Sequence, residues 1–295
     1  DNIKLFSRGF NPRGFMVFLF RILSRLPLSL VHLLGGGLGR LVYWLSPTYR
    51  RFLQENMALA GMAPGLRGAA AAEAGKQMLE LSRIWLRSLE DTNAQVVEVV
   101  GWEYVEQARL VGKGIVFLTP HLGCFEITAQ YYSAFGDITV LYRPPKQAAV
   151  QEMILAGRKR TNLHLAPADV SGVRSLIKAL KRGQAVGMLP DQAPKEGEGV
   201  WLKFFGRYAY TMTLAARLTE TGATTLMAWG ERLPGGQGYR LHFQPPRQSL
   251  MGATVERAQQ INFEIEALIR ECPAQYLWGY NRYKRPGGAE PPPVE

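Results

Sequence analysis

The sequence has little cysteine and lacks the cysteine patterns that bind metals or staple small folds. Only Cys124 and Cys272 occur among 295 residues, without CxxC spacing or a His-rich partner pattern. Zinc sites and disulfide frameworks need clustered or paired ligands. We therefore expect no metal site and no disulfide, which fits a reducing compartment such as the cytoplasm, and a structural role for Cys124.

Long uninterrupted apolar runs are also missing. Arg21 and Arg25 interrupt the first candidate, and Pro27 with the glycines at 35–37 interrupts the second, so neither reaches the roughly 18 residues that a spanning helix needs. Residues 14–45 instead predict short helices lying in the headgroup region, with arginines reaching toward phosphates. A buried pair of helices is the alternative. The chain begins at Asp1 rather than Met, which leaves room for a preceding spanning helix.

Acidic residues are fewer than basic ones, at 24 Asp and Glu against 35 Lys and Arg, a net charge of +11. Such an excess favours an anionic partner, which includes nucleic acid, anionic lipid headgroups and an acidic carrier protein. No nucleic-acid-binding module is recognisable, and the N-terminal arginines are spread among bulky apolar residues rather than gathered on one recognition helix. We expect a membrane surface as partner and no nucleic acid.

A content of 47% hydrophobic and 20% charged residues is typical of a folded protein. Helical periodicity from Tyr49 to Leu89 gives way to short apolar runs alternating with amphipathic segments, which predicts a mixed, mostly parallel central sheet flanked by helices. A turn at Pro234–Gly238 predicts an antiparallel hairpin, and a last helix is expected over Val255–Ile269. The predicted strands are Val96–Val100, Ile115–Leu118, Ile138–Tyr142, Ala185–Leu189, Thr224–Trp229 and Tyr239–Phe243.

This pattern divides the chain into three parts. Residues 1–47 are expected to be a membrane-associated helical segment and residues 48–285 an α/β enzyme domain. Residues 286–295, rich in Pro and Gly, are expected to be a disordered tail.

His121 and Glu126 are the strongest candidates for catalysis. His121 follows an apolar strand, and ligands bind at the carboxyl ends of such strands in open α/β sheets. If residues 120–123 form a turn and a helix starts near Cys124, Glu126 lies in the first helical turn, where the helix dipole favours a carboxylate. The carboxylate can then bond one ring nitrogen and leave the other to take a proton from a hydroxyl. A structural His–Glu pair is the alternative. No GxSxG elbow is present, so direct attack by the hydroxyl of a substrate is a simpler mechanism than one with a covalent enzyme intermediate.

Other polar residues are candidates for substrate binding. Arg143 follows a strand and is fixed by two prolines, so it is placed to bind a phosphate or a thioester oxygen. Arg158, Lys159 and Arg160 form a cationic cluster suited to lipid phosphates or an acidic carrier, with a solvated helix face as the alternative.

Asp191 and Gln192 follow another strand and are expected to line the cleft beside His121, or to form a strand-end turn capped by the aspartate. Residues 197–206, with three aromatic side chains, are expected to receive an acyl chain, to dip into the membrane, or to join the core. His32, His164 and His242 have no acidic partner at a telling spacing, and we interpret them as structural or surface residues.

From about residue 10 to residue 287 the sequence resembles the late acyltransferases of lipid A biosynthesis. The residues that carry the resemblance occur in the family's order: His121 to Glu126 as its HxxxxD/E motif, Tyr142-Arg143-Pro144, Leu189-Pro190-Asp191-Gln192, Gln275-Tyr276-Leu277-Trp278 and Arg282-Tyr283-Lys284. Tyr283 stands where the family usually has Phe, and Gly279-Tyr280-Asn281 also departs from the pattern, which bears on the fit of the acceptor.

The resemblance implies an enzyme of the bacterial inner membrane, with its site facing the cytoplasm. The donor would be an acyl carrier protein thioester, or acyl-CoA, with no other cofactor. The acceptor would be the 3-hydroxyl of an acyl chain on a phosphorylated glucosamine disaccharide. By that similarity His121 is the general base and Glu126 its partner, and Arg282 and Lys284 join the substrate-binding residues. We expect a monomer.

Two other functions remain open from the sequence. One is an acyltransferase that acts on a glycerolipid or another glycolipid, because a His–acid pair does not identify the acceptor. The other is a non-catalytic protein that binds anionic lipid or nucleic acid, which explains the charge but not the strand-end His–Glu pair.

Overall fold

The computed structural model describes residues 12–142 and 162–294, together with residues 151, 155 and 157. Within these residues the helices are α1 (Pro12–Arg25), α2 (Leu28–Leu45), α3 (Pro47–Leu59), α4 (Arg67–Leu86), α5 (Leu89–Asn93), α6 (Trp102–Val111), α7 (Phe125–Tyr132), α9 (Val170–Lys181), α10 (Leu214–Thr219) and α11 (Thr254–Glu271). Short 3-10 turns lie at Pro64–Leu66, Pro234–Gly236 and Pro273–Gln275.

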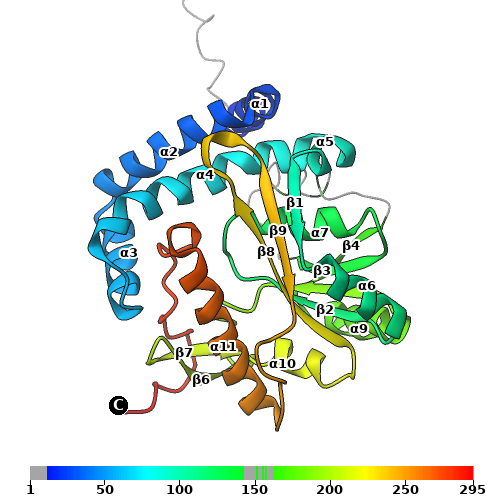
Figure 1. Cartoon of the computed structure of the whole chain (residues 1–295). Helices are drawn as coiled ribbons and strands as arrows, with labels where there is room; N and C mark the ends of the chain where they lie inside the picture. The colour runs from blue at the N-terminus through cyan, green and yellow to red at the C-terminus, as the bar shows by residue number, and fades with distance from the viewer. Residues whose placement is uncertain (1–11, 143–150, 152–154, 156, 158–161, 295) are drawn as a thin grey trace, which may run out of the picture.

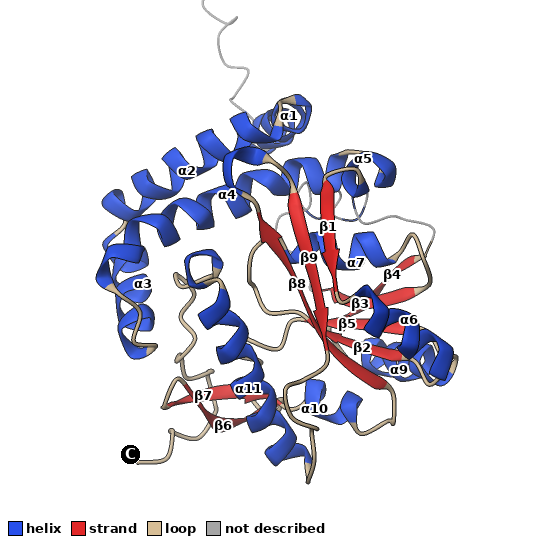
Figure 2. Cartoon of the chain, viewed as in Figure 1, coloured by secondary structure: helices blue, strands red, loops and turns tan. Residues whose placement is uncertain are grey.

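A seven-stranded sheet forms the centre of the protein (Figure 2). Its strand order is β1-β9-β8-β2-β5-β3-β4, and β6 and β7 form a separate antiparallel pair. Neighbouring strands are parallel except at β8 and β9, which form the antiparallel hairpin predicted from the glycine-rich turn. The strands are β1 (Val96–Val100), β2 (Ile115–Leu118), β3 (Ile138–Tyr142), β4 (Leu163–Pro167), β5 (Ala185–Met188), β6 (Gly199–Phe204), β7 (Arg207–Met212), β8 (Thr224–Arg232) and β9 (Tyr239–Gln244).

The sheet separates two hydrophobic cores. Side chains alternate between the faces of a strand, so Val116 and Leu118 of β2 join one core, with residues of α9, α10 and α11. Ile115 and Phe117 join the other, with residues of α4, α6 and α7. All four side chains are buried. The predicted fold, a mixed and mostly parallel sheet flanked by helices, is confirmed.

Helices α2 and α4 lie side by side (Figure 1) and touch through glycines. A Cβ added to Gly39 would lie 2.0 Å from the Ala71 carbonyl oxygen, and one added to Gly75 would lie 2.0 Å from that of Gly35. We expected the glycines at 35–37 to interrupt this helix. They lie inside α2 instead, because backbone contact with α4 outweighs their low helix propensity.

This contact predicts opposite effects for two neighbouring glycines. Gly39→Ala should lower the free energy of unfolding by about 1–3 kcal/mol, because the new methyl group overpacks the α2–α4 contact. Gly37→Ala is the matched control, since nothing lies within 4 Å of its added Cβ, and it should stabilise the helix by up to about 1 kcal/mol. Urea unfolding of both variants measures the difference. Equal stabilities would contradict the close approach of the two helices.

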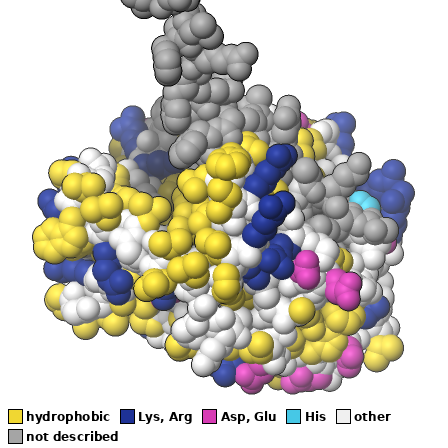
Figure 3. Space-filling model, turned by 90° about the horizontal axis from the view of Figure 1, so that it is seen from above, with side chains coloured by type: hydrophobic (Ala, Val, Ile, Leu, Met, Phe, Trp, Pro, Cys, Tyr) yellow, Lys and Arg dark blue, Asp and Glu magenta, His cyan; other side chains and the backbone are white. Residues whose placement is uncertain are grey.

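The N-terminal helices leave apolar side chains exposed. Among the described helices, α2 alone has the length and composition to cross a membrane, and a third of this helix is buried. Our expectation that no segment qualifies is corrected here. On the outer side, Leu33 is 71% exposed and Trp44 is 72% exposed. Figure 3, seen from above, shows hydrophobic side chains gathered on this face beside Lys and Arg.

Most of the segment 197–206 forms strand β6 of the β6–β7 hairpin, and the C-terminal tail packs against this hairpin. Phe204 and Phe205 are buried in the core, so the expectation that these aromatics join the core holds for them. Trp201 Nε1 donates to the Glu290 carbonyl at 2.9 Å, and Ala289 is buried. The chain therefore contacts the fold as far as Glu290, whereas the sequence predicted disorder from residue 286.

Candidate active site

His121 lies at the carboxyl end of β2, as the sequence predicted. The chain turns after Leu118 and α7 begins at Phe125. At the turn Gly123 has a φ of +58°, and a Cβ there would lie 2.0 Å from the Gly230 carbonyl oxygen, so the close approach to β8 requires glycine. The predicted turn and helix start are confirmed, with Glu126 in the first helical turn.

The carboxylate that contacts the imidazole belongs to Asp191. Its Oδ1 lies 2.7 Å from His121 Nδ1, and its Oδ2 accepts the backbone N–H of His121 at 2.9 Å. Strands β2 and β5 are parallel neighbours in which Leu118 pairs with Met188, and His121 and Asp191 each come three residues after those strand ends. Equal offsets on adjacent parallel strands bring the two side chains together.

Gln192 contacts the other nitrogen of the ring. Its Nε2 lies 3.2 Å from His121 Nε2. An ionised carboxylate only accepts hydrogen bonds, so the Asp191 contact puts the proton of a neutral ring on Nδ1. Nε2 then carries a lone pair, which accepts a hydrogen bond from the amide N–H of Gln192. The same lone pair is able to accept a proton from a hydroxyl that displaces the amide.

Burial and charge act in opposite directions on Asp191. Its side chain is 2% exposed and that of His121 is 15% exposed. Burial raises the pKa of the carboxyl, but the charge of His121 and the hydrogen bonds from its ring and backbone outweigh this, so the pKa lies below its ordinary value. Asp191 is therefore ionised at neutral pH and stabilises a positive charge on the ring.

Glu126 has a different partner from the one we expected. Its Oε2 accepts a hydrogen bond from Trp85 Nε1 of α4 at 3.2 Å, while both ring nitrogens of His121 are occupied by Asp191 and Gln192. The expected pairing of Glu126 with the imidazole is thus corrected. His121 and Glu126 are five residues apart, but their side chains point in different directions. The ring of His121 faces Asp191 after β5, and the carboxylate of Glu126 faces Trp85 of α4.

The turn that carries His121 is held from two sides. Gln77 of α4 donates to the Gly123 carbonyl at 3.1 Å, and the Gly123 N–H donates to the Gln275 carbonyl at 3.0 Å. The Gln275 side chain in turn donates to the backbone of Arg232 at 2.8 Å. Arg232 forms a buried ion pair with Glu80 of α4 at 2.6 Å. The turn that carries His121 is therefore fixed to α4 and to the C-terminal segment.

The other residues predicted to bind substrate are either outside the described part of the chain, buried in the fold, or exposed at its surface. Arg143, Arg158 and Arg160 lie outside the described residues. Arg282 is 2% exposed and donates to the Tyr210 carbonyl and the Thr211 hydroxyl, both at 2.8 Å. This buried position indicates that Arg282 packs the fold, rather than meeting substrate at the surface. Lys284 is exposed, with its Nζ 5.1 Å from the centre of the Tyr280 ring.

Trp85, Gln77 and Gln275 are neighbours of the site that our sequence reasoning did not assign to it. Trp85 and Gln77 carry no local motif, since their contacts depend on how α4 packs. Asp191 was predicted to line the cleft beside His121, but its pairing with the ring depends on β5 lying beside β2, which the sequence does not show. Among the described residues no group of three His, Cys, Asp or Glu side chains is placed to hold a metal ion. Cys124 is buried, and burial together with the charge of Glu80 raises the pKa of its thiol well above the ordinary value.

Comparison with known proteins identifies the family. Residues 12–285 match the family described as bacterial lipid A biosynthesis acyltransferases. The lipid A biosynthesis lauroyltransferase of Escherichia coli (strain K12) is 26% identical over 302 residues, covering 97% of this chain and 98% of the relative. The lipid A biosynthesis palmitoleoyltransferase of the same organism is 27% identical, over 65% of this chain and 63% of the relative. Its lipid A biosynthesis myristoyltransferase is 24% identical, over 76% of this chain and 69% of the relative.

The relatives share one kind of reaction, and this protein is an acyltransferase enzyme with a histidine at the strand ends of its sheet. It belongs to the bacterial lipid A biosynthesis acyltransferase family. The resemblance found in the sequence motifs is thereby confirmed.

Proposed function

We propose that this protein transfers a fatty acyl chain from an acyl carrier protein thioester to the 3-hydroxyl of an acyl chain on a lipid A precursor. The observation that carries the proposal is the His121 ring, whose Nδ1 is held by Asp191 and whose Nε2 lies 3.2 Å from the amide nitrogen of Gln192. A ring oriented in this way is suited to act as a general base.

In the proposed reaction the acceptor oxygen attacks the thioester directly. His121 Nε2 takes the proton of the hydroxyl as its oxygen forms a bond to the thioester carbonyl carbon. The carbon–sulfur bond then breaks, and the imidazolium returns the proton to the departing thiolate of the carrier. The ionised Asp191 stabilises the imidazolium between these steps. The inaccessible thiol of Cys124 and the lack of a GxSxG elbow support direct transfer over an acyl-enzyme route.

Glu126 keeps a place in this proposal through the family motif. Its carboxylate lies in the first turn of α7, four residues past Leu122 of the catalytic turn, and is oriented by Trp85. A negative charge there favours a positive group on substrate or protein near the imidazole. Arg143, Arg158 and Arg160 remain proposed phosphate ligands by the same motifs.

We further propose that α1 and α2 lie on the cytoplasmic face of the inner membrane. The exposed apolar side chains of these helices support this orientation, as do the exposed Arg21, Arg25 and Arg40 beside them, because such a surface buries its apolar part among lipid tails and its cations among phosphates. The acceptor, itself a lipid, would then reach the site from this side. We also propose that the enzyme acts as a monomer.

The test is a transfer assay with the purified protein. Acyl carrier protein thioesters of several chain lengths are incubated with a tetraacylated disaccharide precursor in detergent micelles, and the lipids are analysed by mass spectrometry. A lipid heavier by one acyl group, with one carrier thiol released per transfer, is expected. No heavier lipid at any chain length would reject the acceptor, and transfer from acyl-CoA alone would reject the carrier as donor.

A further inference from the structure

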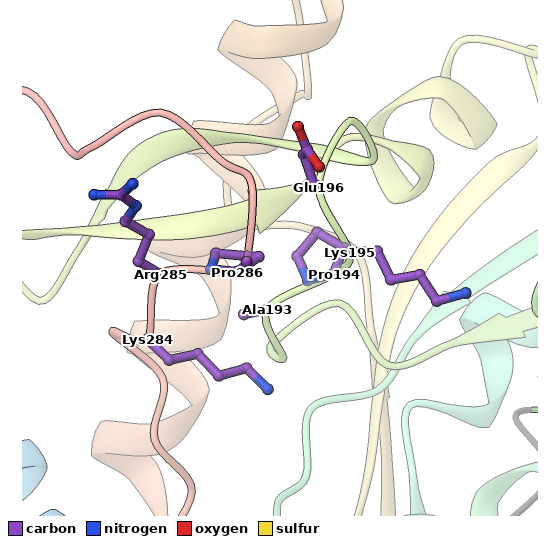
Figure 4. Close-up of a pocket in the computed structure, with 8 residues that line it drawn as sticks. Ala193, Pro194, Lys195, Glu196, Lys284, Arg285 and Pro286 are labelled. Atoms are coloured by element: carbon purple, nitrogen blue, oxygen red, sulfur yellow. The ribbon is translucent and has the colours of Figure 1, made fainter.

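A hollow of about 590 Å³ lies next to the loop that carries Asp191 and Gln192. One wall is Ala193 to Glu196, which directly follows Gln192, and the other is the C-terminal segment Lys284 to Gly287. Figure 4 shows these two segments facing each other. The Ala193 N–H, in the residue directly after Gln192, donates to the Tyr280 hydroxyl at 3.0 Å, which ties the first wall to the chain four residues before the second.

The lining of the hollow suits an anionic, hydrated partner better than a fatty acyl chain. Three cations, Lys195, Lys284 and Arg285, stand against one carboxylate, Glu196, and all four are exposed. The rest of the lining is small or proline, without the large apolar side chains that line most sites for apolar ligands. In Figure 4 the ends of Lys195 and Lys284 extend toward one side of the view and that of Arg285 toward the other. Such a rim is suited to a broad charged surface rather than to one enclosed phosphate.

The hollow also lies away from the apolar face of the N-terminal helices. In Figure 1 the C-terminal segment runs beside β6 and β7 at the bottom of the view, whereas α1 and α2 lie at the top. A lipid acceptor that arrives from the α1–α2 side leaves this opposite side to water. A soluble donor therefore has access to the catalytic loop from the side of the hollow.

We propose that this hollow and its cationic rim, Lys195, Lys284 and Arg285, form the docking surface for the acidic carrier protein that delivers the acyl thioester. The inference rests on the proposed function, because it takes the donor to be a carrier thioester. Opposite charges at such a rim raise the rate of encounter more than they raise the intrinsic affinity, and their effect weakens with salt. The rim would hold the carrier with its thioester directed past Ala193 and Gln192 to the ring.

The experiment compares two donors that differ only in the carrier. In the Lys195→Glu, Arg285→Glu double variant, kcat/KM for the carrier thioester should fall at least about tenfold relative to that for a pantetheine thioester of the same acyl chain at low ionic strength. The difference should shrink as salt is added, and the KM for the acceptor lipid should stay the same. Lys178→Glu, an exposed cation on α9, is the matched control and should leave the donor ratio unchanged.

Three outcomes would overturn the docking surface. They are an unchanged donor ratio, a fall of the same size with both donors, and a raised KM for the acceptor, which would assign the rim to lipid phosphates. Because Arg285 also donates to the Ala289 carbonyl, the single Lys195→Glu variant is measured too and should show part of the same fall.

Binding measured without turnover separates this inference from the proposed function. Surface plasmon resonance with immobilised holo acyl carrier protein should show binding by wild type. In the double variant the association rate constant should fall by at least about tenfold. If wild type binds the carrier in this way but acylates no lipid A precursor, the acceptor assignment fails and the docking surface stands. If wild type acylates the precursor and both proteins bind the carrier equally, the docking surface alone fails.

Discussion

The His121→Ala variant is expected to lose at least about 10²-fold in kcat, the loss typical of a missing general base. The ring supplies the only proton acceptor that our mechanism uses, and alanine leaves Asp191 without the group that it orients. The measurement is the initial rate of carrier thiol release with saturating donor and acceptor. The KM for the donor should change little, because the ring acts in the transition state rather than in binding the carrier.

A second histidine provides the control for this substitution. His164 also contacts an aspartate, Asp137, at 2.7 Å, but its side chain is 50% exposed at the far edge of the sheet on β4. The His164→Ala variant should keep wild-type kcat, and both variants should unfold at similar urea concentrations. Full activity in His121→Ala would remove the ring from the mechanism, whatever its contacts.

The elements that sequence patterns predicted best are those whose signal is local. Strands β1, β2 and β3 have the predicted bounds, because short apolar runs between polar turns determine them. Strand β4 was missed because Leu163–Pro167 is a short edge strand that ends in proline. The β6–β7 pair was missed because the glycines and aromatics of residues 197–206 also fit a loop, and the pairing with residues 207–212 is visible only in three dimensions.

Side-chain pairing depends even more on contacts that are distant in sequence. His121 was predicted from the strand that carries it, but its carboxylate partner lies 70 residues away. The same holds for His32, which contacts Glu80 across 48 residues in the buried interior. A carboxylate five positions from a histidine therefore identified the right segment and the wrong contact. The order of strands in the sheet, which places β5 beside β2, is what the sequence pattern did not contain.

Asp191, which contacts the ring, and Glu126, which bonds Trp85 instead, are expected to respond differently to loss of charge. Asp191→Asn should lower kcat by on the order of 10²–10⁴-fold, as loss of the orienting carboxylate does in comparable catalytic groups. His121 uses both oxygens of Asp191, whereas an amide has one oxygen. Either the ring or the backbone N–H of His121 then loses its acceptor. Glu126→Gln should also lower kcat, but the amide oxygen still accepts from Trp85, so the geometry is kept.

The pH dependence of kcat/KM distinguishes the two roles. Asp191 stabilises the protonated ring, so in Asp191→Asn the acidic limb of the profile should move to lower pH while the maximum falls. In Glu126→Gln the limb should stay in place, because that carboxylate bonds Trp85 rather than the ring. Asp137→Asn, which alters the exposed His–Asp pair of equal length, should leave both the limb and the maximum unchanged. A shifted limb in Glu126→Gln with an unshifted one in Asp191→Asn would return the role of ring partner to Glu126, and would mean that the imidazole changes partner when substrate binds.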